Sequence, residues 1–377
     1  MIVGIDLGTT NSLVAWVNKE GKPEIIVNER GSRLTPSVVH FKSEKQVVVG
    51  ELARSQMFLY PEQTVVRVKR KMGFPFRYTI FGREYTPSEI SGLILRKLKS
   101  YAEAYLGESV DRAVITVPAY FDDNQRQATL KAAQLAGITV MKLLNEPTAA
   151  ALAYNLHAEK ESNLLVLDFG GGTFDISLIH FSQGLFEVVA TGGSTELGGS
   201  DIDEALVQYV VDTVKETEGV DLSQDPVALQ QVYFHVERAK IDLSTVQETT
   251  VVIPYIAVSE KGPVHVRLPI SRERLNNLCS HVFKEIERLI EETLERARVT
   301  REWVQTVIFV GGSSRIPHFR KVVEGIFSGP SVSFCDNLNP DEVVALGAAI
   351  QAGIFEGKVR EVELRDVLPH SLGILDD

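Results

Sequence analysis

Residues 164–178 read LLVLDFGGGTFDISL, and this stretch decides the fold. The run Leu164–Leu167 is short, apolar and β-prone, which is typical of a strand buried on both faces. Asp168 ends the run, three glycines follow, and the alternating residues 173–178 predict a second strand. A glycine turn lets backbone N–H groups approach phosphate oxygens closely. A plain β-hairpin with a flexible turn and solvated acids would show the same pattern.

A second copy of this pattern favours a ligand site. Residues 3–14, VGIDLGTTNSLV, place an apolar strand before Asp6, then Gly8 and two threonines, then another apolar strand. Carboxylates at Asp168 and Asp175 would repel phosphate unless a divalent cation lay between them. The repeat therefore predicts an α/β protein of two related halves that share one ligand, most simply Mg²⁺ with ATP or ADP.

The composition narrows the class of protein. With 377 residues, 44% hydrophobic and 24% charged, the chain is long enough for two or more cored domains. A net charge of −11 argues against nucleic acid or an anionic membrane as the main partner. The two cysteines lie far apart, which supports neither a disulfide framework nor a zinc site. We find no export signal and no run approaching ~18 apolar residues, so we expect a cytoplasmic protein without a membrane segment.

Residues 67–71, RVKRK, place four cations close together in an acidic chain. Such a cluster needs a local reason. A solvated helical face is one explanation, and a functional site is the other.

Glu146 lies between a strand predicted over 138–144 and a helix that begins at Pro147. Proline is a good first helical residue and pushes the residue before it out of helical geometry. Ligands of α/β sheets usually bind beyond the carboxyl ends of the strands. Glu146 is therefore either a site residue or a simple N-terminal cap.

The second half repeats such signals. Glu237, Lys240 and Ser244 share one line along a helix predicted over 226–243, at the border of its buried stripe. Such a row lines a cleft or forms an ordinary solvated edge.

Farther along the chain, the strand predicted over 306–310 runs into residues 311–315, GGSSR, where glycines, hydroxyls and a cation again follow a strand. A long charged helix is predicted over 272–298, and none of its residues suggests a chemical role.

Together these motifs resemble the ATPase domain of the seventy-kilodalton heat-shock chaperone family, closest to its bacterial members, over nearly all of residues 1–375. The motifs are GIDLGTTNS (4–12), VKRKMG (68–73), VITVPAYFDDNQRQAT (114–129), NEPTAAALAY (145–154), DFGGGTFDISL (168–178), LGGSDID (197–203), ERAK (237–240), VGGSSRIP (310–317) and NPDEVVALGAA (339–349). The resemblance implies the actin-like ATPase fold, two duplicated ribonuclease-H-like lobes around a nucleotide cleft. We expect lobe I over 1–160, lobe II over 161–358, and an interdomain linker with the start of a missing substrate-binding domain over 359–377.

The resemblance also implies roles for individual residues. Catalytic roles fall on Lys69, Glu146, Thr173 and Asp168, with Glu146 helping to position the attacking water. The acids of the metal site correspond to Asp6, Asp168 and Asp175. Nucleotide contacts correspond to Gly8, Thr9, Thr10, Asn11, Gly170, Gly171, Gly172, Gly199, Glu237, Lys240, Ser244, Gly311, Gly312, Ser313, Arg315 and Asp341. Pro118 and Arg126 correspond to a relay that links the nucleotide state to the rest of the chaperone.

The implied cofactors are ATP or ADP and Mg²⁺, with K⁺ as a further ion. The implied activity is ATP hydrolysis that couples the nucleotide state to binding and release of unfolded polypeptide by a C-terminal domain absent from this chain. A J-domain co-chaperone and a nucleotide exchange factor are the implied partners of a monomer. An actin-like filament or scaffold protein is the alternative, and a small-molecule kinase of the same superfamily is a third reading, although no acceptor pocket is recognisable.

Three departures from the family pattern bear on function. Ile241 stands where some relatives stack an arginine on adenine, so Arg315 would face an aliphatic partner. Lys142 stands where an arginine used in J-protein coupling is common. Residues 362–365, VELR, occupy the place of a leucine-rich linker, with charges replacing two leucines. Because burying charge is costly, we expect this segment to dock less readily in a hydrophobic groove and to weaken interdomain coupling.

Overall fold

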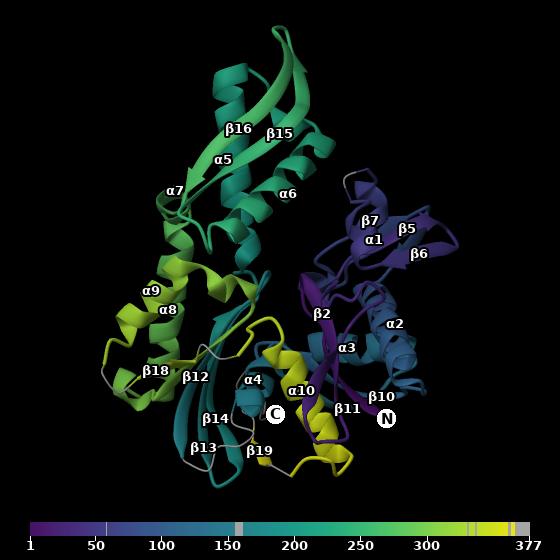
Figure 1. Cartoon of the computed structure of the whole chain (residues 1–377), viewed down its shortest axis with the longest axis vertical. Helices are drawn as coiled ribbons and strands as arrows, with labels where there is room; N and C mark the ends of the chain where they lie inside the picture. The colour runs from purple at the N-terminus through teal and green to yellow at the C-terminus, as the bar shows by residue number, and fades with distance from the viewer. Residues whose placement is uncertain (58, 155–160, 330–331, 336–337, 361–362, 366–377) are drawn as a thin grey trace, which may run out of the picture.

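A computed structural model gives the fold, and it describes residues 1–57, 59–154, 161–329, 332–335, 338–360 and 363–365. Two lobes stand side by side, joined at their base by the helices α4 and α10 (Figure 1). Each lobe is built around one mixed β-sheet. None of the helices in these ranges is long and apolar enough to cross a membrane.

The sheet of lobe I has the order β11–β10–β1–β2–β3, and the short strand β4 (Thr35–Pro36) also pairs with β2. Its strands are β1 (Ile2–Asp6), β2 (Asn11–Val17), β3 (Pro23–Ile26), β10 (Arg112–Val117) and β11 (Thr139–Asn145). β1 runs parallel to β10 and antiparallel to β2. The turn between β1 and β2 therefore lies at the carboxyl end of the central parallel strands.

The sheet of lobe II follows the same plan, with the order β18–β17–β12–β13–β14–β19. Its strands are β12 (Ser162–Phe169), β13 (Phe174–Ser182), β14 (Leu185–Ser194), β17 (Thr306–Val310), β18 (Ser333–Cys335) and β19 (Glu363–Arg365). β12 runs parallel to β17 and antiparallel to β13, just as β1 does with β10 and β2. The two related halves predicted from the sequence are thus confirmed.

The helices of lobe I begin where local capping signals place them. α2 (Pro87–Leu106) starts with a capping box between Thr86 and Glu89, and α3 (Asp123–Leu135) starts with one between Asp122 and Gln125. In both cases the cap side chain accepts a hydrogen bond from the third helical N–H, which satisfies a donor that would otherwise lack a partner.

Two short apolar helices connect the lobes. α4 (Glu146–Tyr154) and α10 (Val343–Phe355) pack against each other, and α10 also covers β1 and β2 of the first sheet. A Cβ atom at Gly347 would lie only 1.8 Å from the carbonyl oxygen of Ala149, so glycine permits this close contact. The hydrophobic cluster around these helices includes buried residues of both sheets. A shared core therefore forms the floor beneath the space between the lobes.

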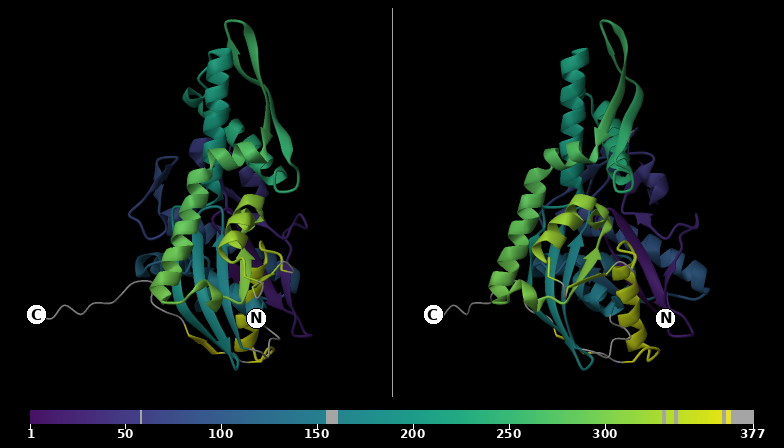
Figure 2. Two further views of the ribbon diagram at one scale, coloured as in Figure 1. Left: turned by 90° about the vertical axis from the view of Figure 1, so that its left-hand side faces the viewer. Right: turned by 60° about the vertical axis from the view of Figure 1, so that its left-hand side comes forward.

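Smaller elements complete each lobe, and Figure 1 shows β5, β6, β7 and α1 above the sheet of lobe I and α5, α6, β15 and β16 above that of lobe II. In lobe I they are β5 (Val39–Ser43), β6 (Gln46–Val49), α1 (Glu51–Arg54), β7 (Thr64–Val65), the 3₁₀ helix η2 (Val68–Lys71), β8 (Tyr78–Ile80) and β9 (Arg83–Tyr85). In lobe II they are α5 (Gly199–Glu218), α6 (Pro226–Asp242), β15 (Glu248–Ser259), β16 (Gly262–Ser271) and α7 (Arg272–Leu278). α9 (Pro317–Ile326) and α8 (Ser280–Ala297) flank the second sheet, and α8 runs along one face of it (Figure 2).

The prediction of a single helix over 272–298 is wrong, because the structure has two helices there, α7 and α8. Cys279 separates them, with φ of −102° and ψ of 16° outside the helical region. Its side chain is fully buried in the core of lobe II. α7 packs against α5 and β16, while α8 packs against β14 and β13 of the sheet.

The linker-like segment is docked in spite of its charges. Residues 363–365 form β19, which pairs in parallel with β14 at the edge of the second sheet. Leu364 packs against the hydrophobic cluster beneath, while Arg365 is exposed. Because successive strand residues point to opposite faces, the segment docks through its backbone and Leu364 without burying Arg365. The charge of Arg365 therefore does not prevent β19 from pairing with β14. Val362 lies outside the described residues.

Candidate functional site

A cavity of about 610 Å³ lies between the two lobes. Apart from the relay pair, it is lined by all but three of the residues that the sequence marked for the site. The lining residues are Asp6, Gly8, Thr9, Thr10, Asn11, Lys69, Glu146, Asp168, Gly170, Gly171, Thr173, Glu237, Lys240, Ser244, Gly311, Gly312, Ser313, Arg315 and Asp341. The exceptions are Gly172, Gly199 and Asp175.

The two strand-turn-strand tips meet at the floor of this cavity. A Cβ atom at Gly171 would lie 2.2 Å from the hydroxyl oxygen of Thr10 in the opposite lobe, so the tips are in direct contact. The carbonyls of Gly170 and Gly171 accept hydrogen bonds of 2.9 Å from the N–H groups of Gly199 and Ser200 at the start of α5. Gly199 thus supports the glycine turn from behind.

The acids near the tips are buried and resist ionisation. Burial raises the pKa of Asp6 to about 7, and the neighbouring Glu146 adds to this effect. Burial also raises the pKa of Asp175 to about 7 and holds that of Asp168 well above its usual range. One carboxylate oxygen of Asp175 is buried without a hydrogen-bond partner in the described part of the chain. Several buried carboxylates that disfavour each other's charge need a cation to offset it.

The donor set fits a hydrated Mg²⁺ ion. Among the described residues, no three His, Cys, Asp or Glu side chains stand close enough to hold a metal ion directly. Mg²⁺ usually keeps several waters and binds through one or two carboxylates together with substrate phosphates. Asp6 and Asp168 line the same cavity, and Asp175 lies immediately behind it.

A buried ion pair faces the tips. The Nζ atom of Lys69 lies 2.5 Å from Oε1 of Glu146, and both side chains are nearly inaccessible to solvent. Burial opposes the charge on Lys69, but the carboxylates of Glu146 and Asp6 outweigh this and raise the pKa of its ammonium group. Lys69 therefore keeps its positive charge inside the cavity. Glu146 sits at the junction of β11 and α4, where the sequence placed it.

The basic cluster 67–71 is not a solvated helical face. Arg67 lies 3.5 Å from Glu204, and Arg70 lies 3.3 Å from Asp201, so both reach across to lobe II. Arg70 also donates a 3.2 Å hydrogen bond to the carbonyl of Gly172, which connects it to the glycine turn. Arg67 and Lys69 thus line the cavity, Arg70 bonds to the glycine turn beside it, and Lys71 does neither.

At the other end of the cavity, charged side chains form pairs that the sequence did not reveal. Lys240 donates to Asp203 at 2.8 Å and to the carbonyl of Gly199 at 3.0 Å. Glu237 accepts a 2.6 Å hydrogen bond from Arg54 of α1, on the opposite lobe.

Arg315 and Asp341, two predicted nucleotide contacts, form a 2.7 Å pair with each other. Ile241 also lines this end, as expected from its place in the sequence. The predicted contacts at this end are therefore already held in place by ion pairs.

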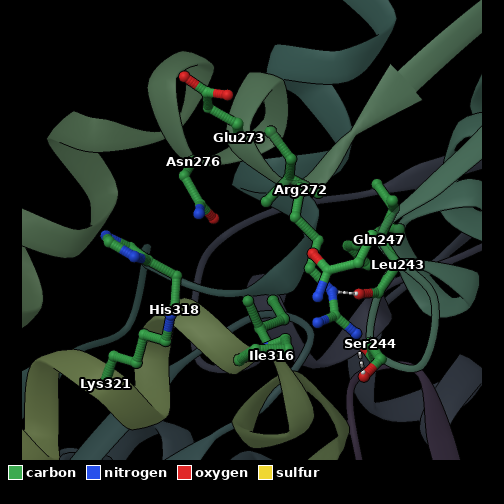
Figure 3. Close-up of a pocket in the computed structure, with 12 residues that line it drawn as sticks. Leu243, Ser244, Gln247, Arg272, Glu273, Asn276, Ile316, His318 and Lys321 are labelled. Carbon is green, nitrogen blue, oxygen red and sulfur yellow. Dashed lines mark hydrogen bonds between the residues drawn. The ribbon is translucent and has the colours of Figure 1, made fainter.

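A smaller cavity of about 260 Å³ opens where α6 ends (Figure 3). Arg272 reaches across it and donates to the carbonyls of Leu243 at 2.6 Å and Ser244 at 3.1 Å. These hydrogen bonds satisfy carbonyls at the C-terminus of α6 and hold Ser244 in position. Arg272 is thus a positioning residue for the larger cavity, although the sequence suggested no role for it.

The predicted relay pair lies beneath the cavity. Arg126 donates to the side chain of Asn145 at 2.7 Å, next to Glu146, and to the carbonyl of Phe121 at 3.1 Å. The N–H of Phe121 donates to the carbonyl of Pro118 at 3.2 Å. In the same loop, the N–H of Tyr120 donates to Asp175 at 3.4 Å. One segment, 118–122, therefore contacts the surroundings of both Glu146 and Asp175.

Two sheets of the same topology, with acidic tips meeting in a cleft between lobes, define a nucleotide-binding protein of the actin-like class. The chain belongs to the Hsp70 family, whose model, described as Hsp70 protein, matches residues 2–81 and 75–376.

Several relatives support this assignment. The chain is 47% identical over 380 residues to the chaperone protein DnaK of Thermotoga petrophila, and equally to that of Thermotoga maritima. DnaK of Thermotoga neapolitana is also 47% identical over 380 residues. These alignments cover 99% of this chain and 63% of each relative, so the chain spans less than two thirds of their length. The assignment does not favour the alternative of an actin-like filament.

Proposed function

We propose that this chain is the ATPase domain of a molecular chaperone, which binds ATP or ADP with Mg²⁺ between its lobes and hydrolyses ATP. The observation that carries the proposal is the buried Lys69–Glu146 pair, which stands beside two acidic tips in a cavity that both lobes form. A lysine that stays charged next to buried acids suits a site for a triphosphate and a cation.

In-line attack of water on a γ-phosphoryl group requires neutralised phosphate charge and a held water, with little covalent work by the protein. The ammonium of Lys69 supplies the neutralising charge, because Glu146 and Asp6 keep it protonated. Glu146 accepts a hydrogen bond from the attacking water and orients it. The hydroxyl of Thr173 lies close to the γ-phosphoryl group and helps to hold the same water. Asp6, Asp168 and Asp175 would hold Mg²⁺, which would supply further positive charge to the phosphates. K⁺ would be the further ion, near Asp175.

The nucleotide contacts divide between the two ends of the cavity. The phosphate end is formed by Gly8, Thr9, Thr10, Asn11, Gly170, Gly171 and Gly172. The adenosine end is formed by Gly199, Glu237, Lys240, Ser244, Gly311, Gly312, Ser313, Arg315 and Asp341. The support for this division is that the first group surrounds the meeting tips and the second lies around the end of α6 and the turn after β17.

The remaining assignments follow the family. Lobe I spans residues 1–160, lobe II spans 161–358, and residues 359–377 lead into a substrate-binding domain. Pro118 and Arg126 carry the nucleotide state toward that domain, where unfolded polypeptide binds and is released. A J-domain co-chaperone and a nucleotide exchange factor act on a cytoplasmic monomer.

The Lys69→Ala variant tests this function. Loss of one preorganised electrostatic group commonly lowers turnover by about 10²- to 10³-fold, so we expect phosphate release from ATP to fall by this amount in a single-turnover assay. Calorimetry should still detect ADP binding, because most contacts remain. Lys131→Ala, at an exposed lysine of α3, is the matched control. Ordinary turnover in the Lys69→Ala variant would remove Lys69 from the mechanism.

A further inference from the structure

Phenylalanine side chains lie exposed along the β8–β9 hairpin of lobe I and the loop before it. Phe74 is 57% exposed, Phe76 is 37% exposed and Phe81 is 43% exposed. Single exposed apolar residues are normal, but large ones gathered in a short stretch mark an interaction site. The nucleotide cavity uses none of the three.

The backbone at Phe81 supports a role in binding. Phe81 and Gly82 form the two-residue turn between Ile80 and Arg83, and their φ angles are 50° and 75°. Two positive φ angles in such a turn favour Asn-Gly, and phenylalanine is disfavoured at the first position. The ring is 43% exposed and belongs to none of the hydrophobic core clusters of the described residues. A residue that costs stability without filling the core suggests a functional reason.

Cations accompany these rings. The Nζ atom of Lys71 lies 5.4 Å from the centre of the Phe76 ring, and the guanidinium of Arg83 lies 4.8 Å from that of Tyr85. Arg77 donates to the carbonyl of Phe76 at 3.2 Å. In the described ranges Lys71, Arg77 and Arg83 form no ion pair with an acidic side chain. Residues 71–85 contain a single acid, Glu84.

Lys71, Phe76, Tyr78, Tyr85 and Arg83 form one row, and Phe74 and Phe81 lie exposed in the same stretch of sequence. Phe76 contacts Tyr78 edge to face with ring centres 4.8 Å apart, and Tyr78 stands opposite Tyr85 across the two strands. The row therefore runs from Lys71 through the rings to Arg83. We call Lys71, Phe74, Phe76, Arg77, Phe81 and Arg83 the hairpin patch. Within the described residues, β8 and β9 pair only with each other, so the outer edge of each strand has no strand partner.

We propose that the hairpin patch docks an extended peptide from another protein, in which acidic residues alternate with apolar ones. The cations of the patch would pair with the acids, the exposed rings would receive the apolar side chains, and an open strand edge would accept the peptide backbone. An anionic membrane fits less well, because the net charge of −11 over the whole chain would oppose approach to an extended negative surface. The proposal goes beyond nucleotide binding and does not depend on it.

The test uses the purified full chain and a fluorescent synthetic peptide in which aspartate alternates with leucine. We expect fluorescence anisotropy to show binding that weakens as salt is added, and no binding of the same peptide with lysine in place of aspartate. Phe81→Asn should lower the affinity about tenfold or more, because exposed aromatic anchors dominate such contacts. The same variant should melt at a higher temperature, because asparagine suits the turn. A purely structural residue would not lose binding while gaining stability.

Two further variants complete the test. Tyr255→Asn is the matched control, because Tyr255 is also an exposed aromatic residue with a positive φ, of 54°, on the β15–β16 hairpin, and its loss should leave peptide binding unchanged. Reversal of charge in the double variant Arg77→Glu, Arg83→Glu should transfer the preference to the lysine peptide. Three results would each overturn the proposal. The natural chain could bind both peptides equally, Phe81→Asn could keep its affinity, or the chain could bind anionic phospholipid vesicles and not the aspartate peptide.

Discussion

The two acidic tips share one topology but are supported differently. In lobe II, the glycine turn is held by α5 through the N–H groups of Gly199 and Ser200, and by Ser313, which donates to the carbonyl of Gly170 at 2.9 Å. Among the described residues, the turn of lobe I is bonded by Ser37, whose side chain donates to the carbonyl of Gly8 and whose N–H donates to that of Thr10, both at 2.8 Å. The same supersecondary plan thus gives one tip anchored by several elements and, in the described part of the chain, one anchored through Ser37.

The surroundings of the two acids differ as well. Burial is the largest influence on both acids and raises the pKa of each. Asp6 also accepts a 3.2 Å hydrogen bond from Thr116, which lowers its pKa, whereas three neighbouring carboxylates raise the pKa of Asp168 further. Lobe I adds Lys69 to its tip, while lobe II adds the end of α6 and the turn after β17. We infer that lobe II forms the fixed platform for the nucleotide and lobe I brings the catalytic charge to it.

The largest expected effect concerns the acids themselves. Asp6→Asn and Asp168→Asn should each lower the affinity for Mg²⁺–ADP by about 10²-fold, because each removes a charge that offsets the cation. In EDTA both variants should bind ADP at least as well as the natural chain, since a buried negative charge near phosphate is gone. Calorimetry measures both affinities.

Asp212→Asn, at an exposed acid of α5, is the control for these variants. If one tip variant lost Mg²⁺ dependence and the other kept it, the two tips would not share one ion.

The second expected effect is a pH dependence of about tenfold per pH unit, since each released proton contributes that slope. The pKa of Asp6 and that of Asp175 are raised to about 7, so protons compete with Mg²⁺ below that pH. Affinity for Mg²⁺–ADP should fall as the pH decreases below about 7 and level off above it. Calorimetry in buffers of different ionisation enthalpy counts the protons released, and no release at about pH 6 would contradict the assignment.

The same groups affect folding without Mg²⁺. Their folded-state pKa values lie above the unfolded value of 3.8, so the folded chain binds more protons between those limits. The free energy of unfolding should therefore decrease as the pH rises from 3.8 to about 7, and stay at the lower value above. Asp6→Asn should flatten this decrease and raise the melting temperature at alkaline pH. A melting temperature that rises over the same range would show that these acids are not buried together.

The smallest expected effect concerns the mouth of the cleft. Arg54 and Glu237 are both about a quarter to a third exposed, and such a pair contributes about 0.5–1 kcal/mol. Arg54→Ala should therefore release a fluorescent ADP analogue about two- to fivefold faster, because a contact between the lobes is lost. Arg238→Ala, on the outer side of the same helix, is the control. A release rate equal to that of the natural chain would show that the pair does not hold the lobes together.

The sequence revealed those parts of the site whose signals are local. Asp6 and Asp168 stand at the ends of apolar runs, and Glu146 stands before a helix-starting proline, so their positions follow from neighbouring residues. Arg54 has no such signal, because its partner Glu237 lies 183 positions away. Arg272 has none either, because the carbonyl of Leu243 to which it donates lies 29 positions away.

Side-chain direction was the other missing information. The charges of residues 362–365 predicted poor docking, but the register of β19 on β14 shows that Leu364 faces the core while Arg365 does not. The cations of the cluster 67–71 likewise take different directions. Lys69 pairs with Glu146, Arg67 and Arg70 reach lobe II, and Lys71 lies over the ring of Phe76. Composition alone does not specify which face a side chain takes.

The most direct test of the account is a double-mutant cycle of Asp6→Asn and Asp168→Asn, measured by calorimetry as affinity for ADP in the presence of Mg²⁺. If both lobes hold one ion, the double variant should bind about as weakly as either single variant, so that the effects do not add. Losses that multiply fully in the double variant would show two independent sites, and would contradict the claim that the two tips meet at one magnesium nucleotide.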